Sequence, residues 1–189
     1  MHPEMSLVIL TVFATAGQCL FLLVLILNAV AHMTTGFTTT GIIVSILFQL
    51  IAIAASFFHL GNKEKGWRAI LMWRNSWLSR EVISISAFTG FATLYLILVI
   101  AGVTHWLRTF SAVVALLSII SFLISSSMLY ASIKYIREWA NAFTPLNFTT
   151  HGLTSAMAVL LLLLYIMTND LSIIYKINIL LIVITTISM

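Results

Sequence analysis

The apolar residues of this chain form six long stretches that are separated by short polar connections. A stretch of about twenty apolar residues is long enough to cross the hydrocarbon core of a bilayer as an α-helix. The stretches cover residues 7–33, 41–60, 82–102, 110–133, 153–167 and 173–189. The pattern predicts an all-α fold, a polytopic transmembrane helical bundle of about six helices, in a single integral-membrane domain over residues 1–189.

Composition supports the same class of protein. Hydrophobic residues make up 61% of the chain and charged residues only 7%, whereas roughly a quarter of the residues of a soluble domain are charged. The single cysteine, Cys19, excludes an internal disulfide and a paired-cysteine metal site. Any iron–sulfur or molybdenum chemistry would therefore belong to another subunit.

The first and last apolar stretches indicate how this sequence relates to the complete protein. The first apolar stretch is too long for a signal peptide and lacks a basic leader, so we expect it to be retained. The last stretch runs to the final residue without a charge after Lys176. We therefore expect further helices in the complete protein.

Small and polar residues recur at helical spacing within the second stretch. Steps of four and three place them on one helix face, and they are Ser45, Gln49, Ala52, Ser56 and His59. The first stretch carries Thr11, Thr15 and Gln18 in a similar manner. Close helix packing would explain such stripes, but the second one leads to an ionisable residue at the membrane edge. We interpret it as the lining of a cleft.

Charge is concentrated between the second and third stretches. Seven of the fourteen Lys, Arg, Asp and Glu residues fall within residues 57–82. If the helices alternate in direction, seven of the nine Lys and Arg residues share the side of the N-terminus. The positive-inside rule assigns that side to the cytoplasm. Basic residues that bind a partner do not have to follow this rule, so the sequence does not decide which compartment the basic side of the membrane protein faces.

The segment 63–80 alternates basic and aromatic residues in the manner of an interfacial amphipathic helix, with indoles at headgroup level. At its end, Ser79 is placed to cap the third membrane helix. Glu81 would then lie in the first turn of that helix, where the helix dipole favours a carboxylate.

His59 closes one predicted helix and Glu81 opens the next on the same side, which suggests a pair that handles protons beside lipid. Quinol oxidation needs such groups, because an oily molecule must release two protons where it reacts. A neutral imidazole can accept a quinol hydroxyl, and Glu81 can take the proton onward, with Arg68 or Arg80 holding its carboxylate ionised. The candidate catalytic residues are His59 and Glu81. Candidates for the surrounding quinol pocket are Gln18, Gln49, Ser56, Trp67, Arg68 and Arg80.

Three separated pieces of sequence resemble one known family. The run "FFHLGNKEKGWRAILMWRNSWLSREV" is similar to the segment after the second helix of the membrane-anchor subunit of bacterial dimethyl sulfoxide reductase, the DmsC family. "LVILTVFATAGQC", preceded by "MHPE", is similar to the N-terminus of that family. "EWANAFTPLNF" resembles its loop before the fifth helix. The resemblance spans residues 1 to about 155, and the family usually has eight helices.

The resemblance implies a role in anaerobic respiration in the cytoplasmic (inner) membrane of a prokaryote. Such an anchor oxidises menaquinol and carries no haem or metal of its own. It passes electrons to a four-cluster iron–sulfur subunit, which serves a molybdopterin catalytic subunit. The positions that match the quinol-binding residues of the family are His59 and Glu81. Partner subunits of this kind are often exported to the outer face, which opposes the positive-inside count.

Three other functions are compatible with the sequence. In a haem-bearing anchor, His59 and His151 would be the axial ligands, although both fall at helix ends. A transporter or channel module would need polar residues at several depths, whereas the titratable groups lie near one edge. A structural anchor without a quinol site would use the basic segment only to bind its partner.

Overall fold

A computed structural model describes residues 5–59, 71–103, 106–132, 143–168 and 171–187. These residues form six helices: α1 (Met5–Ala31), α2 (Thr35–His59), α3 (Trp77–Ile100), α4 (Trp106–Ala131), α5 (Thr144–Met167) and α6 (Leu171–Ile187). The first five are long and apolar enough to span a membrane, and α6 is a shorter apolar helix. The predicted all-helical membrane fold is confirmed.

The predicted helix ends lie close to the observed ones, whereas α2 and α3 begin several residues earlier than predicted, at Thr35 and Trp77, and the fifth helix shows the largest difference. We expected the fifth helix to begin at residue 153, but α5 begins at Thr144. Its first turns are polar, and Pro145 stands at the start, where a missing N–H costs no helical hydrogen bond. Thr149 donates its hydroxyl to the carbonyl oxygen of Pro145 at 2.8 Å. A count of apolar residues misses such turns because their polar groups bond within the helix.

The start of α3 also differs from the prediction. Ser76 is the N-cap, and its hydroxyl accepts a hydrogen bond from the Ser79 backbone N–H at 3.4 Å. Ser79 is therefore not the cap, and Glu81 lies beyond the first turn of the helix. Residues 71–76 form turns, and residues 77–80 belong to α3. The rest of the predicted interfacial segment lies outside the described residues.

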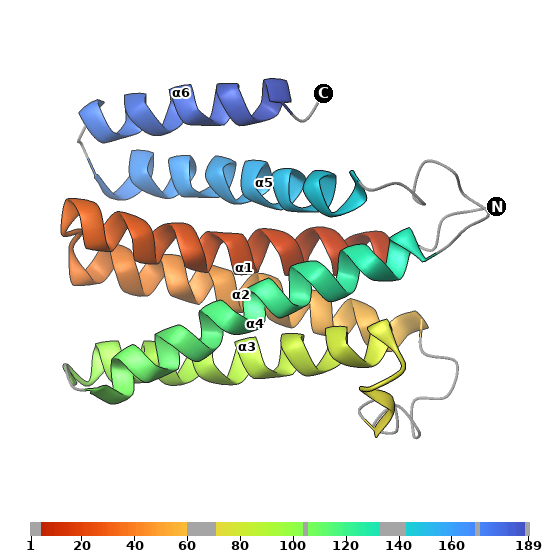
Figure 1. Cartoon of the computed structure of the whole chain (residues 1–189). Helices are drawn as coiled ribbons and strands as arrows, with labels where there is room; N and C mark the ends of the chain where they lie inside the picture. The colour runs from red at the N-terminus through yellow and green to blue at the C-terminus, as the bar shows by residue number, and fades with distance from the viewer. Residues whose placement is uncertain (1–4, 60–70, 104–105, 133–142, 169–170, 188–189) are drawn as a thin grey trace.

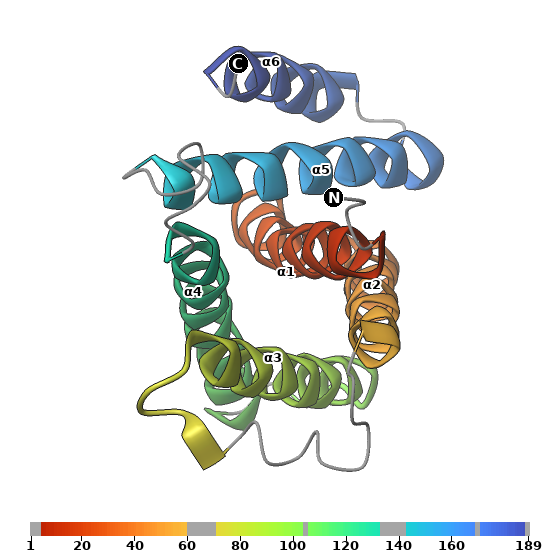
Figure 2. The same ribbon diagram turned by 90° about the vertical axis from the view of Figure 1, so that its right-hand side faces the viewer.

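Helices α1 to α4 form an antiparallel bundle in which α1 packs mainly on α2, and α3 mainly on α4 (Figure 1). Helix α5 packs on α1 and α4, and α6 packs on the outer side of α5 (Figure 2). We call the end of the bundle where α1, α3 and α5 begin, and where α2 and α4 end, the polar rim. It is the right-hand side of Figure 1.

Small residues bring α1 and α2 into close contact. A Cβ atom at Gly17 would lie 2.9 Å from the backbone oxygen of Ser45, and one at Gly41 would lie 2.6 Å from a methyl carbon of Val24. The Ser45 hydroxyl donates to the Gly17 carbonyl oxygen at 2.7 Å. These contacts hold α1 against α2 along much of their length. Further into the bundle, the buried ring of Phe21 packs edge-on against Phe88 at 5.4 Å.

Candidate functional site

The carboxyl group of Glu81 is buried between α3 and α4, close to the polar rim. Glu81 is 3% exposed, and the Ser126 hydroxyl on α4 donates to its Oε1 atom at 2.9 Å. Ser126 is itself fully buried. An ionisable group inside a membrane helix is costly to bury, so its retention is a reason to look for function at that position.

Tyr130 extends this polar cluster toward α1. Its phenol lies close enough to the Glu81 carboxylate for an electrostatic interaction and is within hydrogen-bonding reach of Thr11. On its other side, the Tyr130 ring packs against Phe148 of α5, with ring centroids 5.4 Å apart. Tyr130 therefore connects the buried carboxyl group to the contact between α1 and α5.

Arg80 is turned away from this cluster, although it is next to Glu81 in the sequence. Its guanidinium donates to the backbone oxygens of Trp73 at 2.9 Å and Arg74 at 2.8 Å, and it lies 4.3 Å from the centroid of the Trp77 ring. These contacts hold the turn before α3 against the helix. They take the place of a pairing with Glu81, for which the sequence offered Arg68 or Arg80.

The other predicted catalytic residue, His59, is the last residue of α2. Since α2 ends and α3 begins at the polar rim, the backbone of His59 and that of Glu81 lie at the same end of the bundle. The His59 side chain lies outside the described residues, as do Trp67 and Arg68.

The polar stripe of α2 serves mainly to pack helices. Gln49 is fully buried and its Oε1 atom accepts a hydrogen bond from Gln18 Nε2 at 3.4 Å. The other two amide atoms of this pair, Gln18 Oε1 and Gln49 Nε2, are buried without a hydrogen-bond partner among the described residues. Ser56 is half-buried. Ser45 and Gln49 therefore join α2 to α1, and the lining of a cleft by this stripe stays a prediction.

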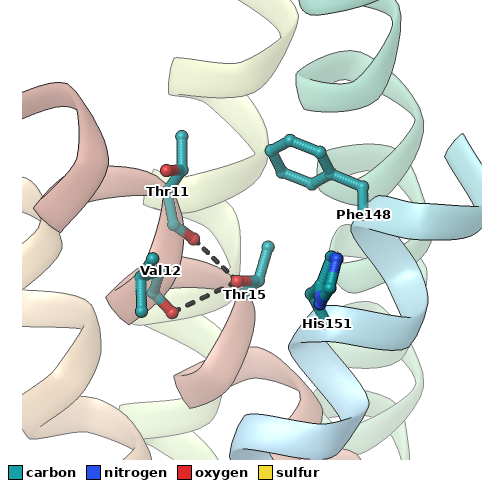
Figure 3. A pocket seen from close by; sticks show the side chains of 5 residues that line it. All are labelled: Thr11, Val12, Thr15, Phe148 and His151. Carbon is teal, nitrogen blue, oxygen red and sulfur yellow. Dashed lines mark hydrogen bonds between the residues drawn. The ribbon is translucent and has the colours of Figure 1, made fainter. Parts of the chain in front are cut away.

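A cavity of about 220 Å³ lies between α1 and α5. It is lined by Thr11, Val12, Thr15, Phe148 and His151. Figure 3 shows Phe148 and His151 on α5 facing the three α1 side chains (Figure 3). The sequence placed Thr11 and Thr15 on one helix face but gave no reason to pair that face with α5.

Within the described part of the chain, no group of three or more His, Cys, Asp and Glu residues is arranged to hold a metal ion. Cys19, the single cysteine, is buried. The polar chemistry of the described site is thus that of one carboxyl group, several hydroxyls and an imidazole.

The fold and this site define a multi-pass helical membrane protein with a buried carboxyl group at one rim. Its whole length, residues 1–189, matches the family model described as "DMSO reductase anchor subunit (DmsC)". The chain belongs to this family of anchor subunits, which are multi-pass proteins of the bacterial inner membrane.

One curated relative is a sulfite dehydrogenase subunit of Allochromatium vinosum, which is 33% identical over 178 aligned residues. The alignment covers 82% of this chain and 53% of that protein, so the chain spans about half the length of the curated relative it matches. No solved structure matches the chain.

Proposed function

We propose that this chain is the quinol-oxidising anchor of a membrane-bound molybdopterin oxidoreductase, in which His59 and Glu81 accept the protons. The main support is the burial of Glu81 at the polar rim, where its carboxyl group has a hydroxyl donor on the neighbouring helix. A structural tether has no need of a carboxyl group in that position, because burying one lowers stability.

Both protons and both electrons of the quinol have a destination in the proposed reaction. The two O–H bonds of the quinol break, one proton passes to the imidazole of His59 and the other to the carboxylate of Glu81. The two electrons pass to an iron–sulfur cluster of a partner subunit, which delivers them to a molybdopterin catalytic subunit. Both protons then leave through the polar rim. Menaquinol is the proposed donor, in keeping with the family resemblance.

The terminal acceptor is set by the catalytic subunit, and dimethyl sulfoxide is one candidate. Electrons could also flow in the opposite direction, from the catalytic subunit to the anchor, because the relative from Allochromatium vinosum is named a sulfite dehydrogenase subunit. A dehydrogenase partner would send two electrons into the anchor. The same two residues would then give two protons to a quinone, since the groups that accept protons in one direction donate them in the other.

The test is Glu81→Gln and, separately, His59→Leu in the full complex in its native membrane. General acid–base catalysis contributes roughly 100-fold or more, so each variant is expected to lower turnover of a menaquinol analogue by about that factor. Electrons supplied directly to the catalytic subunit by an artificial donor bypass the anchor, and this activity is expected to stay unchanged. Reduction of a quinone by the substrate of the complex measures the opposite direction.

Lys176→Gln is the matched control, because it also removes a charge but lies exposed on α6. We expect it to leave both activities intact. Normal quinol turnover in both Glu81→Gln and His59→Leu would contradict the proposal and identify the chain as a structural anchor without a quinol site. Equal loss of quinol-linked and artificial-donor activity would mean that the variants disrupt assembly.

A further inference from the structure

The cavity between α1 and α5 lies in a different part of the bundle from the connection between α2 and α3, which joins His59 to Glu81. Its walls come from Phe148 and His151, after the first turn of α5, and from residues 11–15 of α1. In Figure 2, α5 and α2 lie on different sides of α1. The cavity therefore faces away from α2.

The size of the cavity suits an aromatic ring. Its volume of about 220 Å³ exceeds that of the ~150 Å³ cavities that are known to take up benzene. Val12 is 48% exposed and His151 is also exposed, so the cavity opens on the outer surface of the bundle. We take this surface to face lipid, which would make the cavity accessible to molecules dissolved in the bilayer.

The polar groups of the cavity suit a ring that carries hydroxyl or carbonyl oxygens. The Thr15 hydroxyl donates to the Thr11 carbonyl oxygen at 2.7 Å, and the Thr11 hydroxyl donates to that of Leu7 at 3.1 Å. A hydroxyl that donates one hydrogen bond can still accept from a ligand. The imidazole of His151 makes no hydrogen bond to any other described residue, so it is available to a ligand.

From this arrangement we infer that the α1–α5 cavity binds the ring of a lipid-soluble quinone or quinol, with His151 and the hydroxyls of Thr11 and Thr15 as its polar partners. The Phe148 ring forms an apolar wall, and the tail of the ligand extends into the bilayer. An acyl chain of a phospholipid would fill the space but would leave the imidazole without a partner.

The cavity also connects to the buried carboxyl group. Thr11 lines the cavity and lies within hydrogen-bonding reach of Tyr130, whose phenol interacts with Glu81. When a bound quinol is oxidised, both of its O–H bonds break: one proton passes to the His151 imidazole and the other moves by way of Thr11 and Tyr130 to the Glu81 carboxylate, while both electrons go to the iron–sulfur partner. This step rests on the proposed function, whereas the binding of the ring does not.

The binding test uses a photoreactive azido-naphthoquinone with a short isoprenoid tail, added to membranes that contain the full complex. We expect cross-links within residues 11–15 and 148–151, and we expect excess unlabelled naphthoquinone to prevent them. His151→Leu removes one hydrogen bond and should weaken labelling several-fold, up to about tenfold. Val12→Phe fills the cavity and should abolish labelling.

Val8→Phe is the matched control, because Val8 is 44% exposed on the same helix but does not line the cavity. It should label like the unmodified protein. Labelling that survives both Val12→Phe and His151→Leu would overturn the inference. Cross-links to a photoreactive acyl-chain phospholipid at these residues, unaffected by excess naphthoquinone, would also overturn it and identify a lipid site.

Tyr130→Phe tests the proton route separately. It should lower quinol turnover while leaving the photolabelling unchanged. If Glu81→Gln abolishes turnover but the cavity variants turn over quinol normally and are not labelled, the proposed function stands and this inference fails. If the cavity is labelled as expected but Glu81→Gln turns over normally, the inference stands and the proposed function fails.

Discussion

At the scale of single residues, the contact between Glu81 and Ser126 is the most informative feature of the molecule. The Ser126 hydroxyl of α4 donates to Oε1 of Glu81 on α3, and a second hydrogen bond between the same two helices joins the hydroxyls of Ser84 and Ser121 at 2.7 Å. Together these bonds fix how α3 and α4 align, and the first gives the buried carboxyl group one defined hydrogen-bond donor.

Replacement of Ser126 by alanine should therefore destabilise the protein. The variant leaves Glu81 buried without its donor, and we expect a loss of about 1 kcal/mol. Ser125→Ala is a close control, because the Ser125 hydroxyl donates only to the Ser121 carbonyl oxygen of its own helix at 2.7 Å. Unfolding of both variants in detergent gives the comparison, and equal midpoints would show that the interhelical bond adds nothing.

The sequence pointed to Glu81 because this residue opens one predicted helix on the side where His59 closes the preceding one. It could not point to Ser126, since α4 carries several serines and spacing alone does not tell which one faces α3. Ser125 bonds within its own helix and Ser126 bonds across to Glu81. The pairing depends on the rotation of α4 about its axis, which is set by tertiary packing.

At the scale of helices, the packing of α1 on α2 depends on glycine. A side chain at Gly17 would meet the backbone oxygen of Ser45 at 2.9 Å and the Cβ atom of Phe48 at 3.0 Å. Backbone atoms cannot yield locally, so the two helices would have to separate. The hydrogen bond from Ser45 to the Gly17 carbonyl oxygen would lengthen as well.

Gly17→Ala should accordingly lower stability by about 1–3 kcal/mol, the usual cost of overpacking. Gly90→Ala provides the control, because Gly90 lies within α3 and a Cβ atom there meets nothing within 4 Å. Alanine favours a helix over glycine by up to about 1 kcal/mol, so this control should be neutral or stabilising. Opposite shifts in unfolding midpoint are expected, and parallel shifts would contradict the packing argument.

The existence and order of the helices followed from the apolar pattern, because a segment of suitable length has few alternatives in lipid. The polar first turns of α5 did not follow, and neither did the cavity beside them. Phe148 and His151 precede the apolar stretch that predicted this helix. Their helical conformation depends on local hydrogen bonds, and their position against α1 depends on packing.

At the scale of the whole molecule, aromatic and basic side chains mark both ends of the bundle. Trp73 is 55% exposed at the polar rim, and Trp106 is 75% exposed at the opposite end. Tryptophan is enriched at both membrane interfaces, so these residues indicate where the bilayer ends. Helix α3 runs between the two levels, and its 24 residues span about 36 Å.

The topology can be measured with cysteine reporters and a membrane-impermeant maleimide. Asn75→Cys and Ser132→Cys lie at the polar rim and should be labelled from one compartment, whereas Ala101→Cys should be labelled from the other. The natural Cys19 is only 1% exposed and should stay unlabelled. Labelling of all three reporters from one side would contradict the antiparallel arrangement. The compartment that labels Asn75→Cys also decides between the positive-inside count and the resemblance.

The close contact of α1 with α2 limits how a lipid-soluble molecule can enter the bundle. Helices α1 and α2 are in contact at Gly17 and share a hydrogen bond, which leaves no space for a ligand between them at that point. A ligand that diffuses in the bilayer therefore has to enter between another pair of helices. The α1–α5 seam already stands open near the polar rim, and it narrows at Gly152, where an added Cβ atom would lie 3.1 Å from Thr15. The narrowing closes the inner end of the cavity beside Thr15 and His151, the side chains proposed to bind the ring, so it limits how far a ring can move into the bundle.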